Sequence, residues 1–298
     1  MQSIPKYLLL LVVFLFSGLA TYAQPGMVRQ AVRSLQAGNL EEAQLRIDSA
    51  AAHPETKDVN TTWYYRGFVY KEIYNKREKS NYYSSARRES ITSFERFLSM
   101  DEAPSDLAES ARKSIMYLAT THFNDAATNL TPANYQVAEE NYKEYKTTVQ
   151  IVEPDANFKA RDIQFLLVLG SVFTKIYEAD REENKPYFEK IESTYKDVLK
   201  IDSLNVSANY NLGIHYYNEA VNIIKSLDYA TDLITLEQIQ DDCVRLFRLS
   251  LPYMQKAYDL NPKRKETLIG LAGIYFSLNE MEKSEAVQNE LKLLEENE

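Results

Sequence analysis

The stretch Asn209–Tyr216, which reads NYNLGIHY, decides the fold of this chain. It places a large residue first, a medium residue three positions later, a tiny residue next to it, and an aromatic residue three positions further on. Glycine inside a helix costs about 1 kcal/mol relative to alanine, so Gly213 indicates a place where a second helix comes close. Tyr216 would lie on nearly the same helix face and fill the gap beside the glycine.

The same pattern begins again at Trp63, Leu166 and Leu268. Second helices carry a signature of their own, in which a small or branched residue precedes a larger one by four positions. We expect these second-helix residues to face the first helix of each pair. The signature occurs as Ala43-x3-Ile47, Ser90-x3-Phe94, Ala138-x3-Tyr142, Ile191-x3-Tyr195 and Ser250-x3-Met254.

Together the two patterns resemble the tetratricopeptide repeat (TPR), which reads W-x2-L-G-x2-Y, then A-x3-F, then P. Pro54, Pro154 and Pro262 lie at or near the closing proline. The resemblance implies an all-α fold, an α-solenoid of about six antiparallel helix pairs in a right-handed superhelix. We predict a single helical-repeat domain over residues 24–298, with units at about 26–54, 60–101, 105–154, 155–202, 205–262 and 263–296.

The inner repeats are longer than the family pattern. The chain has only 8 Gly and 9 Pro in 298 residues, which favours a mostly helical chain over a turn-rich fold. Stretches with three- and four-residue apolar spacing, separated by prolines, indicate about twelve helices. The length of a repeat can be compared from the tiny residue of its first helix to a packing position of its second helix. Residues 31 and 50, and residues 272 and 291, match the family spacing between these positions, whereas Gly213 and Ala257 are 44 residues apart. We therefore predict taller middle units and an added element from Leu236 to Phe247. Helix N-termini are expected at the capping pairs Asn39 with Glu42, Thr131 with Pro132, and Thr235 with Gln238.

Residues 1–23 have the pattern of an export signal. Lys6 precedes the apolar run Leu8–Phe16, and Thr21 and Ala23 are the small residues at positions −3 and −1 of a cut after Ala23. No cysteine follows that cut to carry a lipid. We expect a signal peptide at 1–23 and a mature protein that is periplasmic or secreted in a Gram-negative envelope, soluble and without a lipid anchor.

Composition argues against several classes of function. A net charge of −9 and a pI near 5.1 argue against a nucleic-acid partner. One cysteine and three histidines leave little for a disulfide or a zinc site, so we expect no metal and no cofactor. His215 and Glu219 are four residues apart, but no third ligand accompanies them. Cys243 lies in an apolar row typical of a buried thiol. No nucleotide-binding or hydrolase motif occurs, so we predict no enzyme and no catalytic residue.

With these classes of function set aside, a binding surface is the remaining candidate site. In the family, first helices line a concave groove that binds peptides or helices. For Tyr64, Tyr210 and Tyr217 the alternative to exposure in this groove is burial by packing between repeats. Mapping the family's groove positions onto this chain gives the candidate binding residues Tyr64, Phe68, Lys71, Leu167, Lys175, Tyr210, Ile214, Tyr217, Asn218, Ile269 and Phe276.

The 22 tyrosines suggest two functions. Rigid tyrosine side chains supply contact area in protein interfaces, which favours a non-enzymatic scaffold or adaptor for an envelope protein or peptide. Exposed rings also stack on sugars, so the alternative is a glycan- or nutrient-binding accessory of an outer-membrane uptake system. The lack of an anchor cysteine favours the scaffold. The sequence leaves open the partner, the oligomeric state and the role of residues 222–249.

Overall fold

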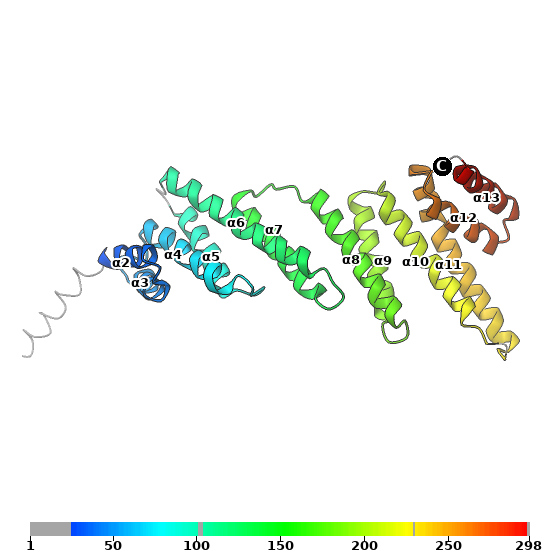
Figure 1. The fold of residues 1–298 in the computed structure, drawn as a ribbon, viewed down its shortest axis with the longest axis horizontal. Coiled ribbons are helices and arrows are strands. Elements are labelled where there is room, and N and C mark those ends of the chain that lie inside the picture. The colour runs from blue at the N-terminus through cyan, green and yellow to red at the C-terminus, as the bar shows by residue number, and fades with distance from the viewer. Residues whose placement is uncertain (1–24, 101–103, 229, 297–298) are drawn as a thin grey trace, which may run out of the picture. The chain divides into compact units, whose positions relative to one another are not determined.

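The computed structural model describes residues 25–100, 104–228 and 230–296. This part of the chain is helical with no strand, which confirms the predicted all-α class. Its helices, labelled in Figure 1, agree in number with the twelve expected. They are α2 (Pro25–Gln36), α3 (Leu40–Ala52), α4 (Asn60–Ile73), α5 (Ser85–Ser99), α6 (Ser105–Asn129), α7 (Tyr135–Val152), α8 (Lys159–Ala179), α9 (Pro186–Ile201), α10 (Val206–Lys225), α11 (Leu233–Leu260), α12 (Lys265–Ser277) and α13 (Met281–Glu296), with a π-helical turn η1 (Tyr74–Glu78) after α4.

The helices fall into two compact units. Unit 1 contains the described residues up to Asn129 together with Gln136–Ala156, and unit 2 contains Leu130–Tyr135 and the described residues from Asn157 onward. Within unit 1, α2 pairs with α3 and α4 with α5, and α3 and α5 then contact the helix that follows. Within unit 2, α8 pairs with α9, α10 with α11 and α12 with α13, and successive pairs again contact each other. The expectation of one domain over 24–298 stays a prediction, because repeats contact mainly their neighbours in any solenoid.

Glycines of first helices lie against second helices, as the repeated pattern predicts. A Cβ on Gly170 would come within 2.6 Å of the Tyr195 ring, and one on Gly213 within 3.1 Å of the Met254 backbone nitrogen. Met254 also packs over Gly270 of α12, where its Cε would lie 2.9 Å from an added Cβ. A single methionine therefore fills the space above glycines of two consecutive repeats.

Serines of second helices bond to the tiny residues of first helices. Three such hydroxyls donate to the main-chain carbonyl of the tiny residue in the paired helix. These bonds fix the register of the pair, because a buried hydroxyl must find an acceptor. They are Ser90 Oγ to Gly67 O at 2.8 Å, Ser250 Oγ to Gly213 O at 2.6 Å, and Ser284 Oγ to Ala272 O at 2.9 Å.

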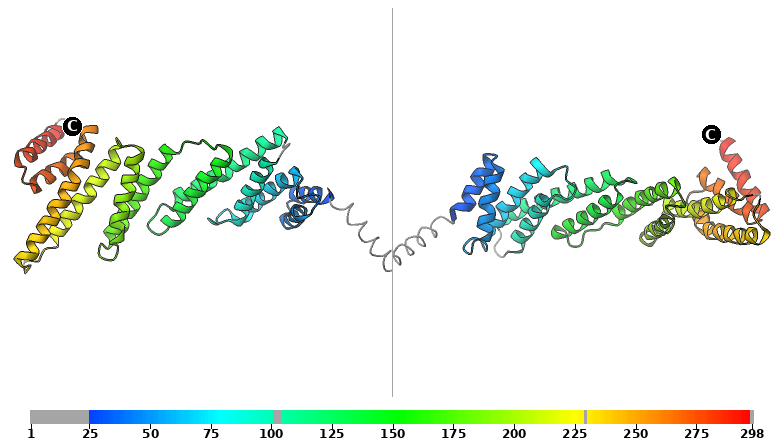
Figure 2. Two further views of the ribbon diagram at one scale, coloured as in Figure 1. Left: turned by 180° about the vertical axis from the view of Figure 1, so that it is seen from behind. Right: turned by 90° about the horizontal axis from the view of Figure 1, so that it is seen from below.

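The middle helices are the long ones, as predicted from the repeat spacing. Helix α6 has 25 residues and α8 has 21, whereas α2 and α12 have 12 and 13. The expected added element is not a separate helix. Residues from Leu236 to Phe247 form the first half of α11, which runs without a break for 28 residues. Figure 2 shows α10 and α11 side by side from two directions.

One of the three predicted capping sites is correct. Asn39 Oδ1 accepts a hydrogen bond from Glu42 N at 3.3 Å. The cap of α11 is Asp232 rather than Thr235, because the Asp232 carboxylate accepts from both Ile234 N and Thr235 N at 3.0 Å. Helix α7 begins at Tyr135, three residues after Pro132, because Thr131–Asn134 form a turn first.

The predicted signal peptide lies outside the described residues. Within the described part of the chain, no helix has both the length and the apolar character needed to cross a membrane.

Candidate functional site

A cleft of about 290 Å³ lies between the first helices of two successive repeats in unit 2. Helix α8 supplies residues three and four positions apart, so they share one face, and α10 supplies the opposite wall in the same way. Tyr195 of α9 lies between the two walls. The lining consists of Ser171, Thr174, Lys175, Tyr177, Glu178 and Arg181, then Tyr195, and then Asn211, Ile214, His215, Asn218 and Glu219.

One end of this cleft is held by a cluster around Glu219. Its carboxylate accepts hydrogen bonds from the Tyr177 hydroxyl at 2.9 Å and from Arg181 Nη1 at 3.1 Å. The pKa of Tyr177 is raised, first by burial and then by its bond to Glu219. Because the carboxylate is occupied by a phenol and a guanidinium, the cluster joins α8 to α10 and leaves Glu219 poorly placed to act as a base.

His215 packs against the side chain and main chain of Phe188. Its Nε2 lies 3.2 Å from the carbonyl oxygen of Phe188, to which the ring N–H donates in the matching tautomer, and the Phe188 ring is 4.2 Å away. Burial lowers the pKa of His215 to about 4. Among the described residues, no group of three or more His, Cys, Asp or Glu side chains could hold a metal ion. The ring is an uncharged packing element at neutral pH.

The middle of the cleft is lined by amides and hydroxyls. Asn211 and Asn218 are seven residues apart on α10, and Ile214 lies between them on the same face. Both asparagines are half-buried. Asn211 also bonds to the Tyr195 hydroxyl. Burial raises the pKa of Tyr195, and its hydrogen bonds, including the one to Asn211, offset only part of that rise. Lys175 and Glu178 face this row from α8 as exposed charges of opposite sign.

Three of the predicted groove residues, Lys175, Ile214 and Asn218, line this cleft. In unit 1 the predicted residues are packed between helices instead. Tyr64 is 8 % exposed and its hydroxyl donates to Ser110 of α6 at 3.2 Å. The ring of Phe68 lies 5.1 Å from that of Phe94.

Further predicted groove residues are also engaged inside the fold. Lys71 Nζ bonds to Ser114 at 3.0 Å, and burial lowers its pKa. Leu167 packs against the core of unit 2. The Arg264 guanidinium stacks 3.6 Å above the ring of Tyr210, and Tyr217 packs on Phe247. Tyr64 and Tyr210 therefore contact residues of the next repeat, and Tyr217 contacts the second helix of its own pair.

Ile269 and Phe276 are the two apolar candidates that lie exposed on the surface, at 57 % and 61 % exposed on α12. A role in binding stays a prediction for all eleven candidates. Sequence reasoning missed Tyr177, Arg181 and Asn211. Tyr177 and Arg181 are four residues apart, a spacing that puts them on one helix face, but only the packing of α8 on α10 brings Glu219 to them.

The fold and this cleft define a helical-repeat protein built from TPR-like helix pairs. No family model matches the sequence, and no curated protein matches it. Solved structures that it resembles include a monomeric mutant of IFIT1 with Gppp-AAAA, at 15% identity and a TM-score of 0.32. They also include a human IFIT1 dimer with m7Gppp-AAAA, at 13% identity and a TM-score of 0.31. Each match covers 88% of this chain, which spans 58% of the length of those chains.

Proposed function

We propose that this chain is a non-enzymatic TPR-like scaffold whose α8–α10 cleft binds an extended segment of a protein partner. The observation that carries the proposal is the pair Asn211 and Asn218 on one face of α10. Seven residues of helix span about 10.5 Å, and three residues of extended chain span about 10 Å. An amide side chain offers one donor and one acceptor group, which match those of a peptide unit.

The remaining lining suits such a segment. Ile214 between the asparagines offers an apolar contact for one side chain of the peptide. Lys175 and Glu178 across the cleft can pair with charges of either sign. With the export expected from residues 1–23, the partner would be a protein of the cell envelope. The absence of a nucleic-acid partner stays a prediction that rests on the net charge of −9.

The test starts from a displayed library of random twelve-residue peptides selected on the full chain. For the selected peptides, affinity is measured by fluorescence anisotropy. If each of Asn211→Ala and Asn218→Ala removes one net hydrogen bond worth about 1 kcal/mol, the double variant is expected to bind about 30-fold more weakly. N-methylation of the peptide main chain at two positions three residues apart is expected to have a similar effect.

Asn124→Ala is the matched control, because Asn124 is an exposed helical asparagine in unit 1. It should leave affinity unchanged. Selected peptides that bind the double asparagine variant as tightly as the wild type would show that the α8–α10 cleft is not the binding site.

A further inference from the structure

A second and larger cleft lies in unit 1, on the side formed by second helices. Its volume is about 800 Å³, within the range of small-molecule sites. Helices α5 and α7 form its walls, and His122 of α6 lies between them. Several polar side chains of the lining are buried, among them Ser84, Asn141 and Thr148. This cleft therefore has a polar floor built into the fold.

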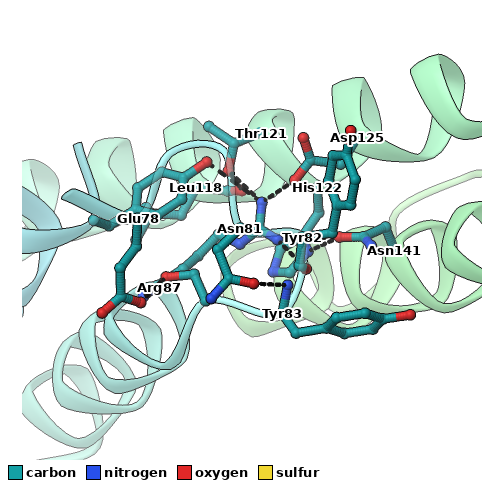
Figure 3. Close-up of polar contacts among 12 residues, drawn as sticks. Glu78, Asn81, Tyr82, Tyr83, Arg87, Leu118, Thr121, His122, Asp125 and Asn141 are labelled. Atoms are coloured by element: carbon teal, nitrogen blue, oxygen red, sulfur yellow. Dashed lines mark hydrogen bonds and ion pairs between the residues drawn. The ribbon is translucent and has the colours of Figure 1, made fainter. Parts of the chain in front are cut away.

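Arg87 organises that floor and is itself fully buried. Its Nη1 donates to Asp125 at 2.6 Å, and its Nη2 donates to Asn141 Oδ1 at 3.1 Å and to the Tyr82 carbonyl at 2.8 Å. The same Asn141 oxygen lies 2.9 Å from His122 Nδ1. Figure 3 shows these groups converging from α5, α6, α7 and the loop before α5. A buried guanidinium with such partners holds all four segments in one arrangement.

This network also fixes the loop that carries Tyr83. Glu78 accepts hydrogen bonds from the Ser84 hydroxyl at 2.7 Å and from Ala86 N at 3.1 Å, and Asn81 Oδ1 accepts from Tyr83 N at 3.0 Å (Figure 3). Tyr83 is nevertheless 54 % exposed. Among the described tyrosines only Tyr83 and Tyr117 are exposed, and of these two only Tyr83 lines this cleft. The fold thus presents a pre-positioned aromatic ring at a polar cleft.

The charges along the walls nearly balance. Arg88 and Lys143 stand against Glu95, Glu140 and Glu144. Such a lining gives little net attraction for an anion or a cation. The only aliphatic side chains in the lining are Ile91 and Ile151, so there is no apolar pocket for a peptide side chain. The cleft is lined instead by hydroxyl, amide and carboxylate groups of Tyr82, Thr92, Thr147, Thr148, Gln150 and the three glutamates.

We propose that this cleft binds a neutral oligosaccharide, with Tyr83 stacking on a sugar ring and the glutamates accepting from sugar hydroxyls. Each sugar hydroxyl is both donor and acceptor, and a carboxylate oxygen makes a stronger bond to a hydroxyl than a neutral acceptor does. The flat ring of Tyr83 presents an apolar face for the C–H groups of the sugar, and its hydroxyl bonds to Glu140 of the opposite wall. This site is separate from the α8–α10 cleft and goes beyond the function proposed there.

The experiment uses the full chain and an array of neutral glucose, mannose, galactose and xylose oligomers of two to six sugars. Binding oligomers are then titrated by calorimetry. Tyr83→Ala is expected to lower their affinity about tenfold through loss of stacking. Glu144→Gln keeps the side-chain shape and weakens the acceptor, so a smaller loss is expected. Both side chains are exposed, and circular dichroism checks that the variants fold.

Tyr117→Ala and Glu109→Gln are the matched controls, because they alter an exposed tyrosine and an exposed glutamate of α6 outside the cleft. The proposal fails if no oligomer binds at millimolar concentration, or if binding survives Tyr83→Ala unchanged. It also fails if the cleft binds a peptide in a Tyr83-dependent manner and no sugar. Asn211→Ala with Asn218→Ala should leave sugar affinity unaltered. The sugar proposal and the peptide proposal are therefore tested independently.

Discussion

Gly67 of α4 lies against the ring of Phe94 of α5, so closely that a Cβ on residue 67 would come within 2.6 Å of two ring carbons. Phe94 is completely buried and its ring also lies 5.1 Å from that of Phe68, so it has little room to move. We expect Gly67→Ala to lower the free energy of unfolding by about 1–3 kcal/mol, even though alanine is the better helix former. Chemical denaturation followed by circular dichroism measures the change.

Gly26→Ala is the comparison for this prediction. A Cβ there would meet only the Gln30 side chain, at 3.8 Å. No loss of stability is expected. Trimming the ring in Gly67→Ala with Phe94→Leu should recover part of the loss, since the two changes act on one contact. Equal stability of Gly67→Ala and the wild type would mean that the two helices are not held this close.

Ser90, Ser250 and Ser284 should contribute separately to stability. Each hydroxyl donates to a first-helix carbonyl in a different repeat. Alanine at any one of them is expected to cost about 1 kcal/mol in unfolding free energy, and the three losses should add because the sites share no partner. Ser193→Ala, at an exposed serine that bonds only within its own helix, should have no measurable effect. Strong non-additivity would indicate that the repeats are coupled through these bonds.

Arg87→Met should be among the most destabilising single changes in unit 1. It leaves Asp125 without its ion-pair partner, at 17 % side-chain exposure, and deprives Asn141 and the Tyr82 carbonyl of a donor. Removal of one partner of a buried pair costs about 3 kcal/mol or more. Thermal denaturation should show a clear drop in melting temperature. The exposed pair of Arg245 with Asp242 supplies the control, since Arg245→Met is expected to change nothing measurable.

The folded chain should become less stable as the pH is lowered from about 6.5 toward 4, because two buried histidines resist protonation. Burial lowers the pKa of both His122 and His215 to about 4, from an ordinary value of 6.5, with the Arg87 charge adding to the shift at His122. The unfolded chain therefore takes up protons first, and stability present above pH 6.5 is lost as the pH falls toward 4. At pH 5.5 each histidine is expected to cost about 1.4 kcal/mol relative to pH 7.5.

Urea denaturation at these two pH values checks the histidine prediction. His122→Gln and His215→Gln should each remove about half of the pH-dependent loss, and the double variant should remove nearly all of it. A double variant that keeps the full loss between pH 7.5 and 5.5 would assign the effect to other groups.

The fold could be predicted because its information is local. A glycine followed three residues later by an aromatic residue, as in Gly213 and Tyr216, predicts a contact with a second helix. The hydrogen bond from Ser250 to the Gly213 carbonyl shows that this second helix is α11. Helix ends were harder to predict. Asp232 and Thr235 both satisfy the chemistry of an N-cap, and only the conformation of the loop after α10 decides between them.

The clefts could be predicted only in part. Lys175, Ile214 and Asn218 line the α8–α10 cleft as the family positions imply. Sequence spacing on one helix does not tell how far the next helix reaches over it, which is why Tyr64 is buried against Ser110 of α6. The unit 1 cleft has no signal in the sequence, because it depends on a buried arginine that joins residues 38 and 54 positions away, Asp125 and Asn141.

Met254 packs over Gly213 and Gly270, and this contact limits how the C-terminal repeats can evolve. At Gly270 an added Cβ would meet the Met254 side chain, so a bulkier residue there requires a smaller one at 254, which would leave a void over Gly213. At Gly213 an added Cβ would lie 3.1 Å from the Met254 backbone nitrogen, a contact that no substitution at 254 removes. Gly270 and Met254 can therefore change only together, whereas Gly213 is constrained by the backbone of α11. A gene that duplicated or exchanged the α10–α11 hairpin would have to bring a compatible α12 with it.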